Sequence, residues 1–196
     1  MNAHHTADEV LDFWFGVPPS TASSASARPE WFRKDAAFDA QIRQRFGATI
    51  DAALAGGLAD WGATKAGVLA RILVLDQFTR NTGRDTPRAF AGDALALADA
   101  QALVAAGDDR LLPPLQRWFA YLPFEHAEDA ALQRQSLALF GALAKEHPVL
   151  TEAAHWAGKH AEVIARFGRY PHRNTVLGRL STAEELAFLA QPGSGF

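Results

Sequence analysis

The chain has 196 residues, and its 19 Lys and Arg against 22 Asp and Glu give a net charge of −3 and a pI near 6.1. This length suits one domain, and the balanced charge argues against the basic face typical of nucleic-acid-binding proteins. The lack of cysteine excludes disulfides, thiolate zinc sites and cysteine nucleophiles. Because the first residues show no signal-peptide pattern and no apolar run has membrane-spanning length, we expect a cytoplasmic protein that binds neither nucleic acid nor membranes.

Helix signals begin at the amino terminus. Thr6 and Glu9 have the spacing of a capping box, and Gly16 is placed to end the helix that the box opens. The Pro-, Ser- and Ala-rich segment 17–30 is too small and polar to form a core, so we expect a mobile loop there. A second helix is expected over 35–54.

The rest of the chain also favours helices. Its apolar residues and cap signals predict helices over 66–79, 87–106, 114–121, 123–146, 152–167 and, from a Ser181–Glu184 capping box, to about 190. No segment alternates apolar and polar residues over strand length. Short connections then predict antiparallel helical hairpins in one all-α domain of residues 1–196, without a clean internal repeat.

Helical geometry places several polar side chains on inward faces, because residues three and four apart share a stripe. In the helix over 152–167, His160 lies on the apolar face and His155 on the opposite one, so they cannot bind one metal together. In the helix over 123–146, Glu125 and Asp129 extend the apolar stripe.

The helix over 66–79 is apolar nearly all round, which indicates a buried helix. Asp76 lies among its apolar residues, and Arg80 follows four positions later, in the favourable order for an ion pair. Asp76 is therefore expected to be buried and to pair with Arg80.

Buried charges are costly unless they are paired, so the inward acids need cationic partners. The segment "RFGRYPHRN" (166–174) offers Arg169 and Arg173 from a turn that contains Gly168 and Pro171. We expect these arginines to approach the inward acids, with Arg80 and Asn81 as a second source of polar contacts.

A simpler interpretation exists for each group. Arg166 and Arg169 flank Gly168 as cations do at a capped helix end. Glu125 and Glu128 fit acids in a first helical turn, and a lone inward histidine is more often a satisfied core residue than a catalyst. The coincidence of inward acids, an inward histidine and a cationic turn is explained equally by a structural ion network and by a ligand pocket.

Long motifs resemble the family designated domain of unknown function 924, in the expected order over nearly the whole chain. They are "VLDFWFG" (10–16), "WFRKDAAFD" (31–39), "LVLDQFTRN" (73–81), "YLPFEHAED" (121–129), "RFGRYPHRN" (166–174) and "LGRLSTAEELAFL" (177–189). The resemblance implies an all-α fold of antiparallel hairpins stacked in a tetratricopeptide-like right-handed superhelix, and no established activity. Ala127 stands where the family pattern has Ser, so no nucleophile is assigned there.

We expect a binding protein whose concave surface holds an anionic small molecule or a peptide carboxylate, because arginine grips such groups through two parallel hydrogen bonds. No cofactor and no metal are expected. The predicted ligand-binding residues are Asp76, Gln77, Arg80, Asn81, Glu125, His126, Asp129, His160, Arg169, His172, Arg173 and Asn174.

Three alternatives stay open. An enzyme would use His126 or His172 as general base, with Glu125 or Asp129 orienting it. A metal site could draw on His126, Asp129 and His160, although their spacing is not diagnostic. Finally, the polar residues could form a structural network while another surface binds a protein partner.

Overall fold

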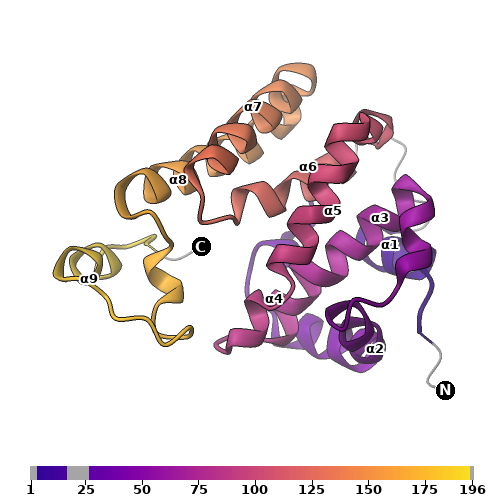
Figure 1. The fold of residues 1–196 in the computed structure, drawn as a ribbon, viewed down its shortest axis with the longest axis horizontal. Coiled ribbons are helices and arrows are strands. Elements are labelled where there is room, and N and C mark those ends of the chain that lie inside the picture. Colours follow the sequence, from indigo (N-terminus) through magenta and orange to yellow (C-terminus); the bar gives the residue numbers. More distant parts are fainter. Residues whose placement is uncertain (1–3, 17–26, 195–196) are drawn as a thin grey trace. The chain divides into compact units, whose positions relative to one another are not determined.

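The computed structural model describes residues 4–16 and 27–194 (Figure 1). Within these ranges the chain forms helices and turns and no strand, which confirms the all-α prediction. The chain divides into two compact units, an amino-terminal unit of Met1–Arg84 and Arg88–Pro123 and a carboxy-terminal unit of Asp85–Pro87 and Phe124–Phe196. The single domain and the superhelical stacking stay predictions, as does the loop, of which residues 17–26 lie outside the described residues.

The amino-terminal unit begins with the helices that the cap signals predict. Thr6 and Glu9 form the capping box of α1 (Ala7–Phe15), and Asp35 caps α2 (Ala36–Leu54) by accepting hydrogen bonds from backbone amides. The remaining elements are η1 (Pro29–Trp31), η2 (Ala59–Ala63), α3 (Lys65–Ile72), η3 (Leu73–Phe78), α4 (Thr79–Thr82), η4 (Pro87–Phe90), α5 (Asp93–Ala106), η5 (Asp108–Leu111) and most of α6 (Pro114–Glu125).

Aromatic side chains form the core of this unit. Trp14 is fully buried, and its ring stacks on Trp31 at 5.8 Å between centroids. Phe78 and Phe119 also contact the Trp14 ring, at 5.6 and 5.5 Å. The core therefore joins residues from four separate elements of the unit.

The predicted helix over 66–79 contains a π-helical turn, η3, between α3 and α4. A side-chain hydroxyl also bonds to carbonyl groups of this wide turn. The Thr79 hydroxyl donates to the carbonyls of Leu75 and Asp76 at 2.7 and 3.2 Å. Gly92 packs so close to this turn that a Cβ there would lie 2.1 Å from the Leu75 carbonyl oxygen.

The predicted helix over 87–106 is divided into η4 and α5 at Gly92. Contrary to expectation, the stretch Pro87–Ala106 does reach membrane-spanning length and apolarity, with a mean hydropathy of 1.3. Its Asp93 and Asp99 nevertheless pair with Arg80 and Arg71, at 2.9 and 2.5 Å. These pairs join α5 to α4 and α3 within the amino-terminal unit.

The carboxy-terminal unit is built around a helical hairpin of α7 (Ala130–Glu146) and α8 (Thr151–Phe167), which run side by side in Figure 1. The unit also contains η6 (Pro148–Leu150), η7 (Pro171–Arg173) and α9 (Ala183–Leu189). Gly168 ends α8 with a φ of +69°, as its cap signal predicts. The last capping box joins Thr182 to Glu185, one residue later than predicted, because the Thr182 hydroxyl reaches the Glu185 amide.

The prediction of one helix over 123–146 is wrong, because α6 ends at Glu125 and α7 begins only at Ala130. Asp129 is the N-cap of α7 and accepts hydrogen bonds from the amides of Ala131 and Leu132 at 2.7 and 2.9 Å. The side chain is therefore exposed rather than inward. An Asp at a helix start satisfies amides that otherwise have no partner, and this preference decides the boundary here.

Candidate functional site

Two predicted site residues of the amino-terminal unit form the expected ion pair. Asp76 is almost fully buried in η3, and its carboxylate lies 2.9 Å from Arg80 Nη1. Gln77 Nε2 donates to the other carboxylate oxygen at 2.6 Å. Arg80 also pairs with Asp93 of α5 at 2.9 Å, so its charge is balanced within the unit.

Asn81 belongs to a second pairing in the same unit. Its Nδ2 donates to Asp39 of α2 at 2.7 Å, and Arg84 grips the same carboxylate at 2.5 and 3.0 Å. Sequence reasoning missed Asp39, Arg84 and Asp93 as partners. The signal available was the position of Asp39 on the buried face of a helix, next to Phe38 and Ile42.

The carboxy-terminal unit brings Glu125 and His126, at the end of α6, to His160 of α8. His160 Nδ1 lies 3.1 Å from Glu125 Oε1 and 3.0 Å from the Trp156 carbonyl oxygen. Burial first, and then the charge of His126, lower the pKa of His160 to about 3. His160 is therefore a neutral, inward imidazole, as its position on the apolar face predicts.

Glu125, His126 and His160 each offer a potential ligand atom, and these atoms lie within 4.8 Å of one another. The sequence hypothesis of a metal site named both histidines but chose Asp129 as the carboxylate. Because Asp129 caps α7, that ligand set does not form, and the carboxylate near the two histidines is that of Glu125.

The turn that carries Glu125 is held by two buried side chains of the same unit. Gln133 Nε2 of α7 lies 2.8 Å from the carbonyl oxygens of Glu125 and Ala127. The Tyr170 hydroxyl also donates to the Glu125 carbonyl. Sequence reasoning missed Gln133, although it lies one turn from Ser136 on the inward face of α7.

Tyr170 also lies at the centre of a group of cation-forming side chains. The Arg173 guanidinium carbon is 4.6 Å from the Tyr170 ring centroid, and the rings of His160 and His172 lie 5.5 and 5.7 Å from it. Burial raises the pKa of Tyr170, so its hydroxyl stays protonated and can donate. Glu125 and His126 adjoin this group through His160. We call the whole set the Tyr170 cluster, and its members are Glu125, His126, His160, Tyr170, His172 and Arg173.

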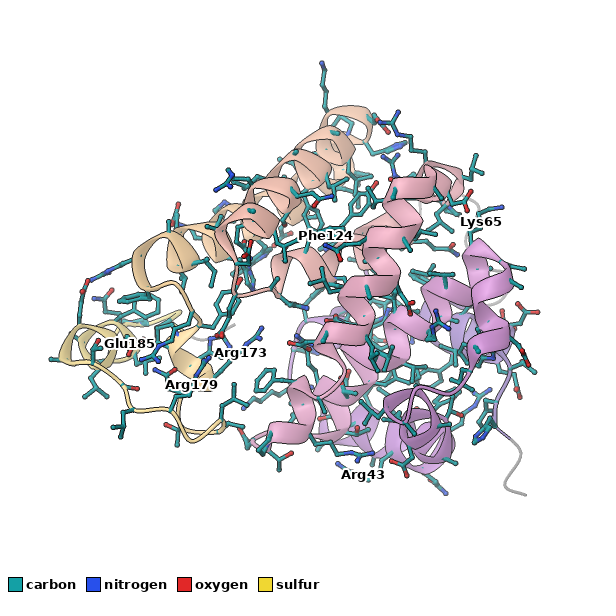
Figure 2. All side chains as sticks on the ribbon, in the orientation of Figure 1. Arg43, Lys65, Phe124, Arg173, Arg179 and Glu185 are labelled. Atoms are coloured by element: carbon teal, nitrogen blue, oxygen red, sulfur yellow. The ribbon has the colours of Figure 1, made fainter. Side chains whose placement is uncertain are left out.

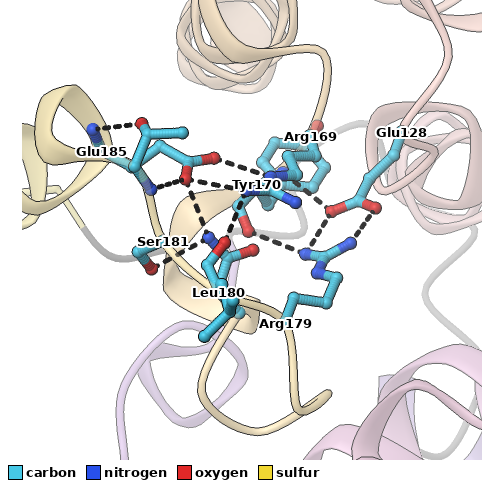
Figure 3. A network of polar contacts seen from close by, with 9 residues as sticks. Glu128, Arg169, Tyr170, Arg179, Leu180, Ser181 and Glu185 are labelled. Atoms are coloured by element: carbon cyan, nitrogen blue, oxygen red, sulfur yellow. Dashed lines mark hydrogen bonds and ion pairs between the residues drawn. The ribbon is translucent and has the colours of Figure 1, made fainter.

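Two arginine–carboxylate pairs hold the chain that follows α8 (Figure 3), in the region where Figure 2 labels Arg173, Arg179 and Glu185. Arg169 grips Glu185 of α9 at 2.7 and 2.8 Å, and Arg179 grips Glu128 at 2.6 and 2.9 Å. Asn174 Nδ2 donates to Glu185 at 3.2 Å. Arg169 and Asn174 are thus structural members of this unit, in addition to any part they take in binding.

The carboxylates of these pairs titrate at unusually low pH. The hydrogen bonds from Arg169, then from the Thr182 amide, lower the pKa of Glu185 to about 2. Burial alone would raise the pKa of Glu128, but bonds from Arg179 and the Tyr170 amide outweigh it and lower the value. Glu128 lies in the loop before α7, so its predicted place in a first helical turn is wrong.

The amino-terminal unit also has an open hollow of about 400 Å³ between α1 and the start of α2. Arg28, one of its lining residues, donates to the carbonyls of Phe13 and Trp14 and pairs with Glu30. Because none of the predicted site residues lines this hollow, it is not the predicted ligand site.

The fold and these contacts define an all-helical protein with a histidine–carboxylate cluster in its carboxy-terminal unit. The chain belongs to DUF924, a family described as bacterial protein of unknown function, whose model matches residues 10–193. Among solved structures it is similar to the protein of unknown function ATU0120 from Agrobacterium tumefaciens, with 37% identity and a TM-score of 0.82 over 94% of this chain and 96% of the other. No curated protein gives a significant match.

Proposed function

We propose that this is a binding protein whose Tyr170 cluster holds a small anionic molecule or a peptide carboxylate. The carrying observation is the position of the Arg173 guanidinium, 4.6 Å from the Tyr170 ring centre, in a cluster that also contains His126 and His172. A guanidinium that is little exposed to water interacts strongly with an anion, because water screens the attraction less.

The potential in this cluster supports an anion. After burial, which is the main cause, the positive charges of His126, Arg173 and His172 all lower the pKa of His160. Of these groups, the Arg173 guanidinium stays positively charged at neutral pH, and its charge attracts a negative ligand. His126 and His172 are only half-buried within their unit, so their imidazoles offer donors to a molecule arriving from solvent.

The proposal gives Arg80 and Arg169 smaller parts than the sequence suggested. Each grips a carboxylate of its own unit, Asp76 and Asp93 for Arg80 and Glu185 for Arg169. An anion would have to compete with those carboxylates for these two arginines. Of the contacts predicted from the sequence, the direct contacts of Arg80 and Arg169 with the ligand therefore have the least support.

The proposal also includes the stacking of the hairpins in a tetratricopeptide-like right-handed superhelix and a cytoplasmic location. The antiparallel hairpin of α7 and α8 supports the proposed stacking of hairpins. A peptide with a free carboxylate fits such a scaffold, because stacked hairpins present extended surfaces to extended ligands.

An enzyme that uses a histidine–carboxylate pair is a second candidate, and the contact of His160 with Glu125 favours it. However, a general base works best when its pKa lies near the working pH. A pKa of about 3 makes His160 a weak base at neutral pH, so the enzyme hypothesis depends on the predicted bases His126 and His172 rather than on the histidine that contacts Glu125.

Thermal unfolding at constant ionic strength tests the proposal with inorganic phosphate, succinate and a short peptide whose carboxyl terminus is free or amidated. At least one anion should raise the Tm of the wild type by several degrees, as binding to the folded state requires. The shift should be lost in Arg173→Gln and reduced in His172→Asn. Because His172 is only half-buried, its substitution should disturb folding less than that of the buried Arg173.

Arg166→Gln is the matched control, because Arg166 is an exposed arginine of α8 paired with Glu184. It should respond as the wild type does. If no anion shifts the Tm of the wild type, or if all variants shift equally, the proposed site is wrong.

A further inference from the structure

We propose that Glu125, His126 and His160 bind a divalent transition-metal ion. This site goes beyond the proposed anion binding and does not depend on it. The geometric basis is the convergence of a potential ligand atom from each of the three side chains within 4.8 Å. Two of the three residues are buried, so the arrangement is not a group of solvated surface acids.

The types of ligand atom indicate the class of ion. Imidazole nitrogen suits zinc, copper, iron and nickel, whereas magnesium and calcium prefer sites made of oxygen. Two histidines and a carboxylate match catalytic zinc and non-haem iron sites, which keep further positions open. We therefore expect zinc, cobalt or iron to bind in preference to magnesium.

His160 is already oriented as metal-binding histidines usually are. Its Nδ1 faces two acceptors, the Trp156 carbonyl oxygen at 3.0 Å and Glu125 Oε1 at 3.1 Å, so Nδ1 carries the proton and Nε2 would be the ligand atom. A hydrogen bond from the second ring nitrogen to a carbonyl or carboxylate is the common support of a histidine ligand. The backbone bond to Trp156 can persist when Glu125 turns to the metal.

The backbone around the other two ligands is also fixed. Gln133 Nε2 contacts the carbonyl oxygens on both sides of His126, those of Glu125 and Ala127, at 2.8 Å each. Tyr170 donates to the Glu125 carbonyl as well. The consecutive ligands Glu125 and His126 therefore start from a held turn, and only their side chains need to move.

The size of that movement is small. Zinc bonds to nitrogen and oxygen are about 2.0–2.2 Å long, so tetrahedral ligand atoms lie roughly 3.4 Å apart. Contraction from a spread of up to 4.8 Å is within the reach of rotations about side-chain bonds. His126 is only half-buried and is the side chain with most freedom to adjust.

The test uses full-length, untagged protein that has been treated with EDTA and then freed of chelator. Calorimetric titration with Zn²⁺ should give one ion per chain, and Co²⁺ should produce visible absorption bands with nitrogen and oxygen ligands. His126→Asn and Glu125→Gln should weaken Zn²⁺ binding by more than tenfold, since losing even a supporting group of a metal site costs about 10–100-fold. In His160→Asn the side-chain amide can still donate to Trp156, so the fold is retained while the ligand nitrogen is lost.

Two histidines provide matched controls. His155 is an exposed residue of the same helix as His160, and His5 forms another histidine–carboxylate contact, with Glu9 at 3.1 Å. His155→Asn and His5→Asn should bind Zn²⁺ as the wild type does. The proposal is overturned if the wild type binds no Zn²⁺, or if His126→Asn and Glu125→Gln bind it as tightly as the controls.

The metal and anion proposals can fail separately. Arg173→Gln removes a positive charge near the metal ligands, so it should keep Zn²⁺ binding or tighten it while abolishing the anion-induced shift. Anion binding without Zn²⁺ binding would reject the metal site alone, and Zn²⁺ binding without any anion effect would reject the proposed function alone.

Discussion

Gln133 and Tyr170 lie 37 residues apart in the sequence, and the Gln133 side-chain amide donates to the Tyr170 hydroxyl at 3.0 Å. This bond joins α7 to the segment that follows α8. Because Tyr170 in turn donates to the Glu125 carbonyl, the two residues together hold the turn that presents Glu125 and His126.

Tyr170→Phe should therefore lower the free energy of unfolding. The substitution keeps the ring that Arg173 and His160 contact but leaves buried polar groups of Gln133 and Glu125 with one partner fewer, at a cost of about 1–3 kcal/mol. Urea unfolding measures this loss. In a double-mutant cycle with Gln133→Leu, the losses of unfolding free energy caused by the two substitutions should not add up. Additive losses would contradict the shared role of the pair.

The close approach of Gly92 to η3 predicts a large effect of one methyl group. In Gly92→Ala the new Cβ would lie 2.1 Å from the Leu75 carbonyl oxygen, so the backbone must shift. We expect a loss of about 1–3 kcal/mol, as in other overpacked sites. Gly47→Ala is the control, because its Cβ meets nothing within 4 Å in the interior of α2. It should stabilise the protein by about 0.5–1 kcal/mol, and equal effects of both substitutions in urea unfolding would refute the packing argument.

Glu185 should contribute to resistance against acid. Its pKa falls to about 2 in the folded protein, below the ordinary value of 4.5, so the unfolded state binds a proton at higher pH than the folded state does. The stabilisation is complete above the ordinary value and is lost as the pH falls from about 4.5 to 2. Glu185→Gln should flatten the pH dependence of stability in this window, whereas Glu184→Gln at the exposed neighbouring residue should not. Tm values measured from pH 2 to 6 would decide this.

The Arg179–Glu128 pair predicts an asymmetry between single and double substitutions. Arg179→Met should cost about 1–2 kcal/mol, because the half-buried Glu128 carboxylate keeps its charge but loses two charge-assisted hydrogen bonds, in part replaced by water. Adding Glu128→Gln should recover part of that loss, since no unpaired charge remains. Chemical denaturation of both variants provides the measurement, and a double variant as unstable as the sum of the singles would contradict the pairing.

Local patterns predicted the fold well. The Thr6–Glu9 box, the Gly168 cap and the Asp76–Arg80 pair each depend on residues within four positions, so their chemistry can be read without knowing the tertiary structure. The inward position of His160 followed from helical periodicity alone. Periodicity also places Trp156 on the apolar face of α8, and there the method fails, because the Trp156 side chain is 44% exposed.

The candidate site could be predicted only in part. The structure brings together the predicted residues Glu125, His126, His160, His172 and Arg173 of the carboxy-terminal unit. It separates Asp129 from them, because the position of Asp129 fits a helix cap as well as the inward stripe. The partners were not predictable, because Arg169–Glu185 and Gln133–Tyr170 form across turns whose geometry the residue pattern does not encode. Buried amides such as Gln133 carry no charge signal, so sequence reasoning passes over them.

The π-helical turn Leu73–Phe78 sets the rotational phase between the two α-helical segments that it joins. A π-turn contains about one residue more than an α-turn, and each residue of an α-helix advances about 100° around the axis. Deleting one residue there would rotate Thr79, Arg80 and Asn81 by about that angle relative to α3. Arg80 would leave Asp93, and Asn81 would leave Asp39. The extra residue thus sets the rotation at which Arg80 contacts Asp93 of α5 while Asn81, on another face of the same helical stretch, contacts Asp39 of α2.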